Sequence, residues 1–249
     1  MLRLRTLGGV SLFRGDERLS EFLAGSKRVA LLIYLALGDS EQVYERDEII
    51  SVFWPDTTDG KARAALRQQL HVVRKDLGPG LIDSEGSRLR LAPGVLECDA
   101  RDFESHLVEG RPSQALSTYR GDFLKGFFVT GAPDFEEWAA GFGRRVRDKA
   151  AGAGRRLAAI HRDDGDVPAA LRSLRRVLEI APYDQRSLRA LMELLMAAGE
   201  NGQAILEYER FATRLANDLD THPAPETASL LDQARMRAEA DRPGPQVTG

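Results

Sequence analysis

The chain has 249 residues, of which 43% are hydrophobic and 29% charged, a composition typical of one large globular domain or two domains of about 100 to 150 residues. The net charge of −3 gives no overall argument for nucleic-acid binding, and a single cysteine, Cys98, excludes an internal disulfide and a zinc cluster built on thiolates. The longest apolar run, residues 29–37, is too short for a bilayer, which requires about 20 residues, and residues 1–9 lack the apolar segment of a signal peptide. We therefore expect a cytoplasmic protein with no membrane contact.

Strand and helix patterns alternate in the first half of the sequence. Leu2, Leu4 and Thr6 lie on one face of a run that precedes Gly8-Gly9 and a second apolar run, which predicts a hairpin. The elements that follow are a helix over residues 27–37 with Ser26 as its cap and Gly38 at its end, a possible strand over 42–45, and a helix over 46–54 that Pro55 stops.

A third helix and a second hairpin complete this half. The helix begins at Thr58 or Asp59 and runs to Leu77, before Gly78-Pro79-Gly80. Two short apolar runs then flank Glu85-Gly86. In the second run Leu89 and Leu91 alternate with Arg88 and Arg90, which predicts a hairpin with one apolar and one basic face.

The second half is helical and contains a repeat. Residues 100–240 show helical periodicity with few strand signals, and two stretches align with a shift of 34 residues. The matched pairs include Gly165 with Gly199, Ala170 with Ala204, Leu174 with Tyr208 and Val177 with Phe211. A 34-residue period with Gly at the helix turn and Ala at a close helix crossing is the tetratricopeptide pattern.

The helix over residues 59–77 has two unlike faces. Steps of 100° per residue place an apolar stripe on one side, formed by Ala62, Leu66, Leu70, Val73 and Leu77. The other side carries Arg63, Arg67, Gln68, His71, Arg74 and Lys75. Residues 60–94 hold seven Lys or Arg against three Asp or Glu, a local balance of +4. An isolated helix with these faces is more often a solvated surface helix, so the neighbouring elements decide its interpretation.

Those neighbours favour DNA binding. Helix, turn, helix and hairpin is the winged-helix order, in which the second helix enters the major groove and the hairpin contacts the backbone or the minor groove. Arg and Gln side chains bind base edges, and Lys and Arg bind phosphates. We predict base contacts for Arg63, Arg67 and Gln68, phosphate contacts for His71, Arg74 and Lys75, and a position near the minor groove for Arg88 or Arg90.

The fold class predicted from these patterns is multidomain. An α+β winged helix-turn-helix domain over residues 1–98 is followed by an all-α tetratricopeptide-like domain over 99–240 and a flexible tail over 241–249. We expect Trp54 to anchor the core of the first domain and Trp138, Phe142 and Val146, spaced four residues apart, to anchor that of the second.

The order of elements resembles that of a known family. The stretches RDEIISVFWP and ARAALRQQLHVVRKDLG are similar to the OmpR/PhoB type of winged-helix domain found in Streptomyces antibiotic regulatory proteins (SARPs). YRGDFLKGF, IAPYDQ, GQAILEYERF and HPAPETASLL resemble the bacterial transcriptional activator domain (BTAD) that follows it in those regulators. The resemblance implies a transcriptional activator that binds direct repeats of double-stranded DNA as a homodimer and contacts RNA polymerase through its sigma subunit. The sequence departs from the family pattern at Asp76 and in the acidic wing tip, residues 83–87.

Other kinds of chemistry have little support in the sequence. No phosphate-binding loop or nucleophile elbow occurs, and the four histidines have no ligand-pair spacing, so we expect neither an enzyme nor a metal or cofactor. Cys98 is expected to be a buried structural residue. One rival function remains open. Because residues 1–94 carry fourteen basic and thirteen acidic residues, the chain could instead be a tetratricopeptide-type interaction scaffold whose winged helix serves protein contacts only.

Overall fold

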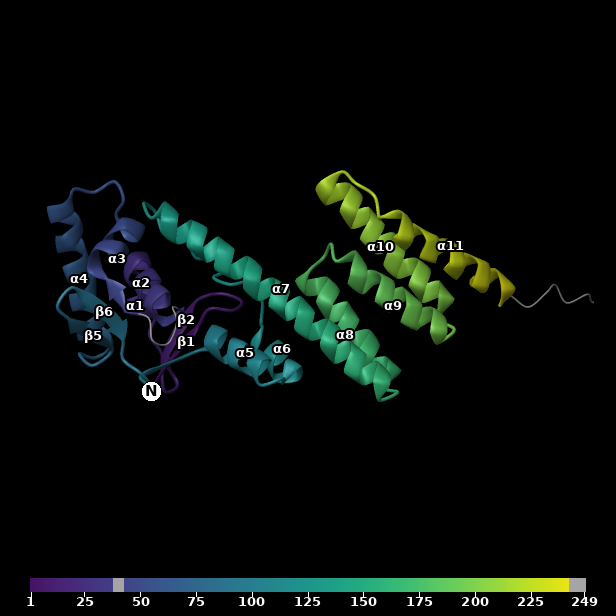
Figure 1. Cartoon of the computed structure of the whole chain (residues 1–249), viewed down its shortest axis with the longest axis horizontal. Coiled ribbons are helices and arrows are strands. Elements are labelled where there is room, and N and C mark those ends of the chain that lie inside the picture. Colours follow the sequence, from purple (N-terminus) through teal and green to yellow (C-terminus); the bar gives the residue numbers. More distant parts are fainter. Residues whose placement is uncertain (38–42, 242–249) are drawn as a thin grey trace, which may run out of the picture. The chain divides into compact units, whose positions relative to one another are not determined.

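The computed structural model of the chain describes residues 1–37 and 43–241 (Figure 1). The predicted helix stop at Gly38, the first residue of the predicted strand over 42–45, and the predicted tail beyond Asp241 lie outside these residues. The chain divides into two compact units, Met1–Val146 and Arg147–Gly249, and the division falls inside one long helix, α7 (Pro133–Asp163).

The predicted amino-terminal hairpin is present and belongs to a larger sheet. β1 (Leu2–Arg5) pairs antiparallel with β2 (Ser11–Arg14), with Leu4 opposite Leu12 and both side chains buried. Gly8 and Gly9 make the turn at φ values of 92° and 127°, where residues with a Cβ are strained. The sheet has the order β3-β2-β1-β7, because β3 (Glu17–Arg18) pairs with β2 and β7 (Leu96–Cys98) lies parallel to β1.

β7 leads directly into a partly buried carboxylate that accepts hydrogen bonds from the residues after β1. Asp99, the first residue of α5 (Asp99–Val108), accepts hydrogen bonds from the Thr6 amide (2.7 Å), the Thr6 hydroxyl (2.7 Å) and the Leu7 amide (3.1 Å). Burial raises the pKa of Asp99, and these hydrogen bonds act against that rise. Cys98 is 2% exposed, and burial raises the pKa of its thiol to about 12, so the expected structural cysteine is confirmed.

The helices predicted from the first half are present. The short α1 (Ser20–Leu23) leads into α2 (Ser26–Leu37), which is buried from Val29 to Ala36 and forms the centre of the unit. α3 (Arg46–Phe53) ends one residue earlier than predicted, and α4 (Asp59–Leu77) ends at Gly78 with φ 115°. The predicted apolar stripe of α4 is confirmed, because its buried residues are Ala62, Leu66, Leu70, Val73 and Leu77. Thr58 stands at the N-cap position, but its side chain makes no capping hydrogen bond.

The second predicted hairpin is formed by β5 (Ile82–Glu85) and β6 (Arg88–Leu91). β4 (Tyr44–Glu45) pairs with β6, so this sheet has the order β4-β6-β5. Leu89 is fully buried, whereas Arg88 and Arg90 point to solvent as the alternation predicted. Figure 1 shows the hairpin beside α4, within the same unit.

The first unit also includes residues beyond 98. α5 and α6 (Pro112–Thr118) form a helical pair, and the first half of α7 contributes aromatic rings to the core beside α2 and α3. The ring of Trp138 lies 5.0 Å from that of Tyr34 and 5.6 Å from that of Phe142, and Phe135 lies 5.3 Å from Phe53. Phe142 and Val146 are buried as predicted, but the expectation that this stripe anchors the core of the second domain is wrong, because the stripe lies in the first unit and Trp138 packs on Tyr34.

The second unit is built of helices. After the end of α7 it comprises α8 (Val167–Ile180), α9 (Gln185–Ala197), α10 (Asn201–Leu219) and α11 (Pro225–Ala240), each packed on the next. Glycines lie in the connections from α7 to α8 and from α9 to α10. Gly165 and Gly199, which match in the 34-residue repeat, have nearly equal φ values of 78° and 77°. Ala170 and Ala204, the matched alanines, are fully buried. The repeat detected in the sequence therefore corresponds to a repeated turn and a repeated close helix contact.

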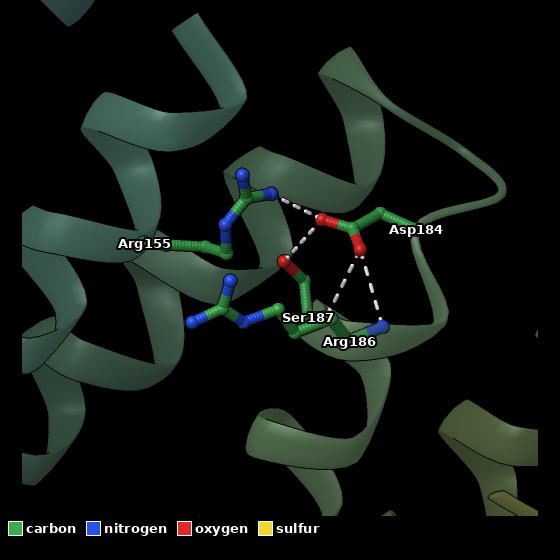
Figure 2. A network of polar contacts seen from close by, with 4 residues as sticks. All are labelled: Arg155, Asp184, Arg186 and Ser187. Atoms are coloured by element: carbon green, nitrogen blue, oxygen red, sulfur yellow. Dashed lines mark hydrogen bonds and ion pairs between the residues drawn. The ribbon is translucent and has the colours of Figure 1, made fainter. Parts of the chain in front are cut away.

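The start of α9 is held by a polar network around Asp184 (Figure 2). The Asp184 carboxylate accepts hydrogen bonds from the backbone amides of Arg186 and Ser187 (3.1 and 3.4 Å) and from the Ser187 hydroxyl (2.7 Å). It also forms an ion pair with Arg155 of α7. One side chain thus caps α9 and joins it to the carboxyl-terminal part of α7.

Candidate nucleic-acid interface

Residues of α3, α4 and the tip of the β5–β6 hairpin line a groove of about 550 Å³. α4 positions its share of the lining because the leucines of its buried stripe fix the rotation of the helix, which turns the opposite face outward. Arg46, Arg63, Arg67 and Arg74 line the groove together with His71, and Asp47 is the acidic residue of the lining. The groove is therefore a basic, open surface suited to an anionic ligand.

The predicted DNA-contacting residues are all accessible, but the groove brings only part of them together. Arg63, Arg67, His71 and Arg74 line it, and Gln68, Lys75, Arg88 and Arg90 lie outside it on exposed positions. Arg74 is half-buried, whereas the side chains of Arg63 and Arg88 are 56% and 64% exposed. The assignment of these eight residues to DNA contacts stays a prediction.

Several of these cations already bind an acidic side chain. Arg63 of α4 pairs with Asp47 of α3 at 3.1 Å, Arg88 pairs with Glu45 at 3.0 Å, and Arg90 pairs with Asp83 at 3.1 Å. Hydrogen bonds from Ser87 and from Arg88 lower the pKa of Glu45. All three pairs are exposed to solvent, where an ion pair contributes little to the stability of the fold. A phosphate can therefore replace the carboxylate at small cost.

Arg74 has a different local role. Its guanidinium donates hydrogen bonds to the Ile82 carbonyl (3.2 Å) and to the Ser84 hydroxyl, both on β5. These bonds hold the hairpin against the last turns of α4. In contrast, no hydrogen bond or ion pair to another side chain is found for Arg67 or His71 in the part of the chain that the structure describes.

Three residues of the lining were not predicted from the sequence: Arg46 and Asp47, from the first turn of α3, and Ser87, from the hairpin. Residues 45–48 form a charged cluster, a pattern that is typical of a solvated helix start. The helix-turn-helix order could have indicated Arg46 and Asp47, since this order places the start of the first helix beside the second helix.

Among residues 1–37 and 43–241, no group of three or more His, Cys, Asp or Glu side chains is arranged to hold a metal ion. Within the same ranges, no helix combines the length and the apolar character needed to cross a bilayer.

Comparisons with known proteins match almost the whole chain. The family described as the bacterial transcriptional activator domain matches residues 98–235. Regulatory protein AfsR of Streptomyces griseus is 26% identical over 272 residues, which cover 98% of this chain and 26% of the relative. Regulatory protein AfsR of Streptomyces coelicolor is 26% identical over 243 residues, which cover 90% of this chain and 23% of the relative. The chain thus spans about a quarter of the length of these curated relatives.

A solved structure has a similar fold. Mycobacterium tuberculosis EmbR, determined in complex with a low affinity phosphopeptide, has a TM-score of 0.67 and 21% identity, and the match covers 95% of this chain and 65% of EmbR. At this identity the likeness concerns the fold.

In its largely helical fold with a small amino-terminal β region, and in its sequence, the chain is similar to transcriptional regulators of the SARP type. The chain belongs to the bacterial transcriptional activator domain family.

Proposed function

We propose that the chain is a sequence-specific DNA-binding transcriptional activator. In this proposal α3, α4 and the β5–β6 hairpin act as a winged helix, with α4 in the major groove and the hairpin as the wing. The observation that carries the proposal is the groove: arginines from two helices converge on it, on the outer face of a helix whose inner face is fixed in the core.

Each predicted contact has a proposed role. The amino-terminal part of a recognition helix lies closest to the bases, so Arg63, Arg67 and Gln68 are proposed to bind base edges. His71, Arg74 and Lys75 follow along the helix and are proposed to bind or flank phosphates. Arg88 and Arg90, on the exposed face of β6, are proposed to contact the minor groove or its backbone. We add Arg46 as a phosphate contact from α3.

The finer properties of the family are proposed for this chain as well. Residues 1–98 would bind DNA, and the tetratricopeptide-like residues 99–240 would join two protomers side by side on a direct repeat. The same helical residues would contact RNA polymerase through its sigma subunit. The activity is proposed to be cytoplasmic and to require neither a metal nor a cofactor, and no enzymatic step is proposed.

Selection of bound DNA from a random pool, followed by footprinting, tests this function. We expect the selected duplexes to share a sequence repeated in the same orientation at a fixed spacing. Binding to that duplex should weaken steeply when the salt concentration is raised from 50 to 200 mM, in proportion to the number of phosphates contacted. Selection of no common sequence, with weak binding to all duplexes at both salt concentrations, would favour the interaction scaffold instead.

A further inference from the structure

Asp47 occupies an unexpected place in the basic groove. It lies in the first turn of α3 and faces Arg63 in the second turn of α4. The Arg63 Nη2 atom lies 3.1 Å from one carboxylate oxygen of Asp47 and 3.4 Å from the other. Both side chains are well exposed, at 56% for Arg63 and 75% for Asp47.

Helix stability alone does not account for this position. An acidic side chain in the first turn of α3 interacts favourably with the helix dipole, but Glu48 supplies the same charge in the same turn without lining the groove. A carboxylate in a groove that receives DNA repels the phosphates of every sequence equally. Asp47 therefore lowers affinity for any DNA unless it contributes something else to recognition.

The contact with Arg63 supplies such a contribution. An arginine side chain is long and flexible, and on an open helix face its guanidinium can turn to a phosphate as easily as to a base. Asp47 engages a terminal nitrogen of Arg63 from the side of α3 and leaves the other donors of the guanidinium unengaged by the carboxylate. A guanidinium held in one direction can bind the O6 and N7 atoms of guanine with two parallel hydrogen bonds.

We propose that Asp47 is a positioning residue that sets the sequence specificity of DNA binding by orienting Arg63 toward a guanine edge. It also disfavours the turning of Arg63 toward phosphates on non-operator DNA. The proposal deepens the proposed function and rests on it. Arg67, which lacks such a partner in the described residues, is not restricted in this way.

The test compares the full chain with variants on two duplexes, the selected operator and a scrambled sequence of the same length. The variants are Asp47→Ala, Asp47→Asn, the matched control Glu48→Ala, Arg63→Ala and the double variant Asp47→Ala/Arg63→Ala. The quantity measured is the ratio of the two dissociation constants, and circular dichroism checks that each variant keeps its helical content.

We expect Asp47→Ala to lower the operator-to-scrambled preference by about two- to fivefold, the worth of one exposed ion pair, mainly through tighter binding to scrambled DNA. Asp47→Asn keeps a hydrogen-bond acceptor, so its operator-to-scrambled preference should lie between that of Asp47→Ala and that of the unaltered chain. Glu48→Ala should leave the preference unchanged. In the Arg63→Ala background, Asp47→Ala should have no further effect on the preference, because the side chain that it orients is absent.

Two results would overturn the proposal. Asp47→Ala and Glu48→Ala could raise the affinity for both duplexes by the same factor. Asp47 would then act only through the non-specific repulsion between its negative charge and DNA. Alternatively, the preference could fall equally with and without Arg63, which would exclude orientation of Arg63 as the cause. If the unaltered chain shows no preference between any duplexes, the proposed function fails and this inference fails with it; a preference that Asp47→Ala leaves unchanged overturns the inference alone.

Discussion

Arg67 and Arg74 lie two turns apart on α4, yet their guanidinium groups are in different situations. Arg74 donates hydrogen bonds to β5, so its removal affects the packing of the hairpin as well as any DNA contact. Arg67 is exposed in the middle of the groove and makes no such bond within the described residues. Arg67 is therefore the cleaner residue with which to test base recognition.

We expect Arg67→Ala to weaken operator binding by about 1–3 kcal/mol and to relax the preference at one base position, because a two-point contact to a base edge is lost. Binding to scrambled DNA should change much less. Fluorescence anisotropy with a labelled operator measures both. The matched control is Arg18→Ala, which removes an exposed arginine of β3 away from the groove and should leave specific binding unaltered. Equal losses for the two variants would mean that only net charge matters.

Much of the candidate site could be predicted from the sequence because its residues lie on one helix. A 3.6-residue period places Arg63, Arg67 and His71 on one face without any knowledge of the rest of the fold. Asp47 and Arg46 could not be found in this way. They join the groove only through the packing of α3 on α4, and the distance between two helices is not encoded in the period of either. The ion pair of Arg88 could not be predicted for the same reason, since its partner Glu45 lies 43 residues away in the sequence, on another strand.

At the scale of elements, Asp184 is the side chain that fixes the beginning of α9. Its carboxylate accepts two amide hydrogen bonds and one hydroxyl hydrogen bond, and it is only 18% exposed beside Arg155. The corresponding cap of α8 is simpler, because Asp166 accepts one hydrogen bond, from the Ala169 amide at 3.0 Å.

We expect Asp184→Ala to lower the free energy of unfolding by about 2–3 kcal/mol, since it removes a helix cap and leaves Arg155 partly buried without its carboxylate. Asp166→Ala, the matched control, should cost about 1 kcal/mol, the usual effect of losing a cap. Urea unfolding followed by circular dichroism measures both. Asp184→Asn separates the contributions, because it retains an acceptor for the amides but not the charge. Equal losses for Asp184→Ala and Asp166→Ala would show that the contact with Arg155 adds no stability.

The length of an element decides whether it can be predicted from the sequence. α4, α8 and α10 run for 14 to 19 residues, so their apolar periods repeat several times. β3 and β7 contain two and three residues, too few to show alternation. β7 becomes a strand because it pairs with β1, at the amino-terminal end of the sequence. The turn glycines of the repeat were predictable because a positive φ imposes glycine at both equivalent positions.

At the scale of the whole molecule, residues beyond 98 complete the core formed by the residues before them. The Asp99 carboxylate accepts hydrogen bonds from the Thr6 and Leu7 amides. Trp138 and Phe135 of α7 pack on the rings of Tyr34 and Phe53. The predicted division at residue 98 therefore cuts through hydrogen bonds and ring contacts within one compact unit, Met1–Val146.

These contacts predict that a fragment of residues 1–98 is unstable and that a fragment of residues 1–146 folds. The shorter fragment lacks Asp99 and so leaves the amides of Thr6 and Leu7 without their acceptor, at a cost of about 1–3 kcal/mol for each buried group. It also lacks the partly buried Trp138 and the buried Phe135, which is 1% exposed; truncation of a buried ring such as that of Phe135 to alanine costs about 3–5 kcal/mol. Together these losses are comparable with the whole stability of a small domain, about 5–15 kcal/mol.

Urea unfolding of the two fragments checks this expectation. The fragment of residues 1–146 should unfold in one cooperative transition. The fragment of residues 1–98 should show no transition, and its tyrosine signals should show little chemical-shift dispersion in an NMR spectrum. In the full chain, Phe135→Ala, at a side chain 1% exposed, should destabilise the first unit by about 3–5 kcal/mol, whereas Phe128→Ala, at a side chain 76% exposed, should change its stability by less than about 0.5 kcal/mol. If residues 1–98 instead unfold cooperatively at the urea midpoint of residues 1–146, the DNA-binding half is an independent domain, and the division predicted from the sequence at residue 98 is the physical one.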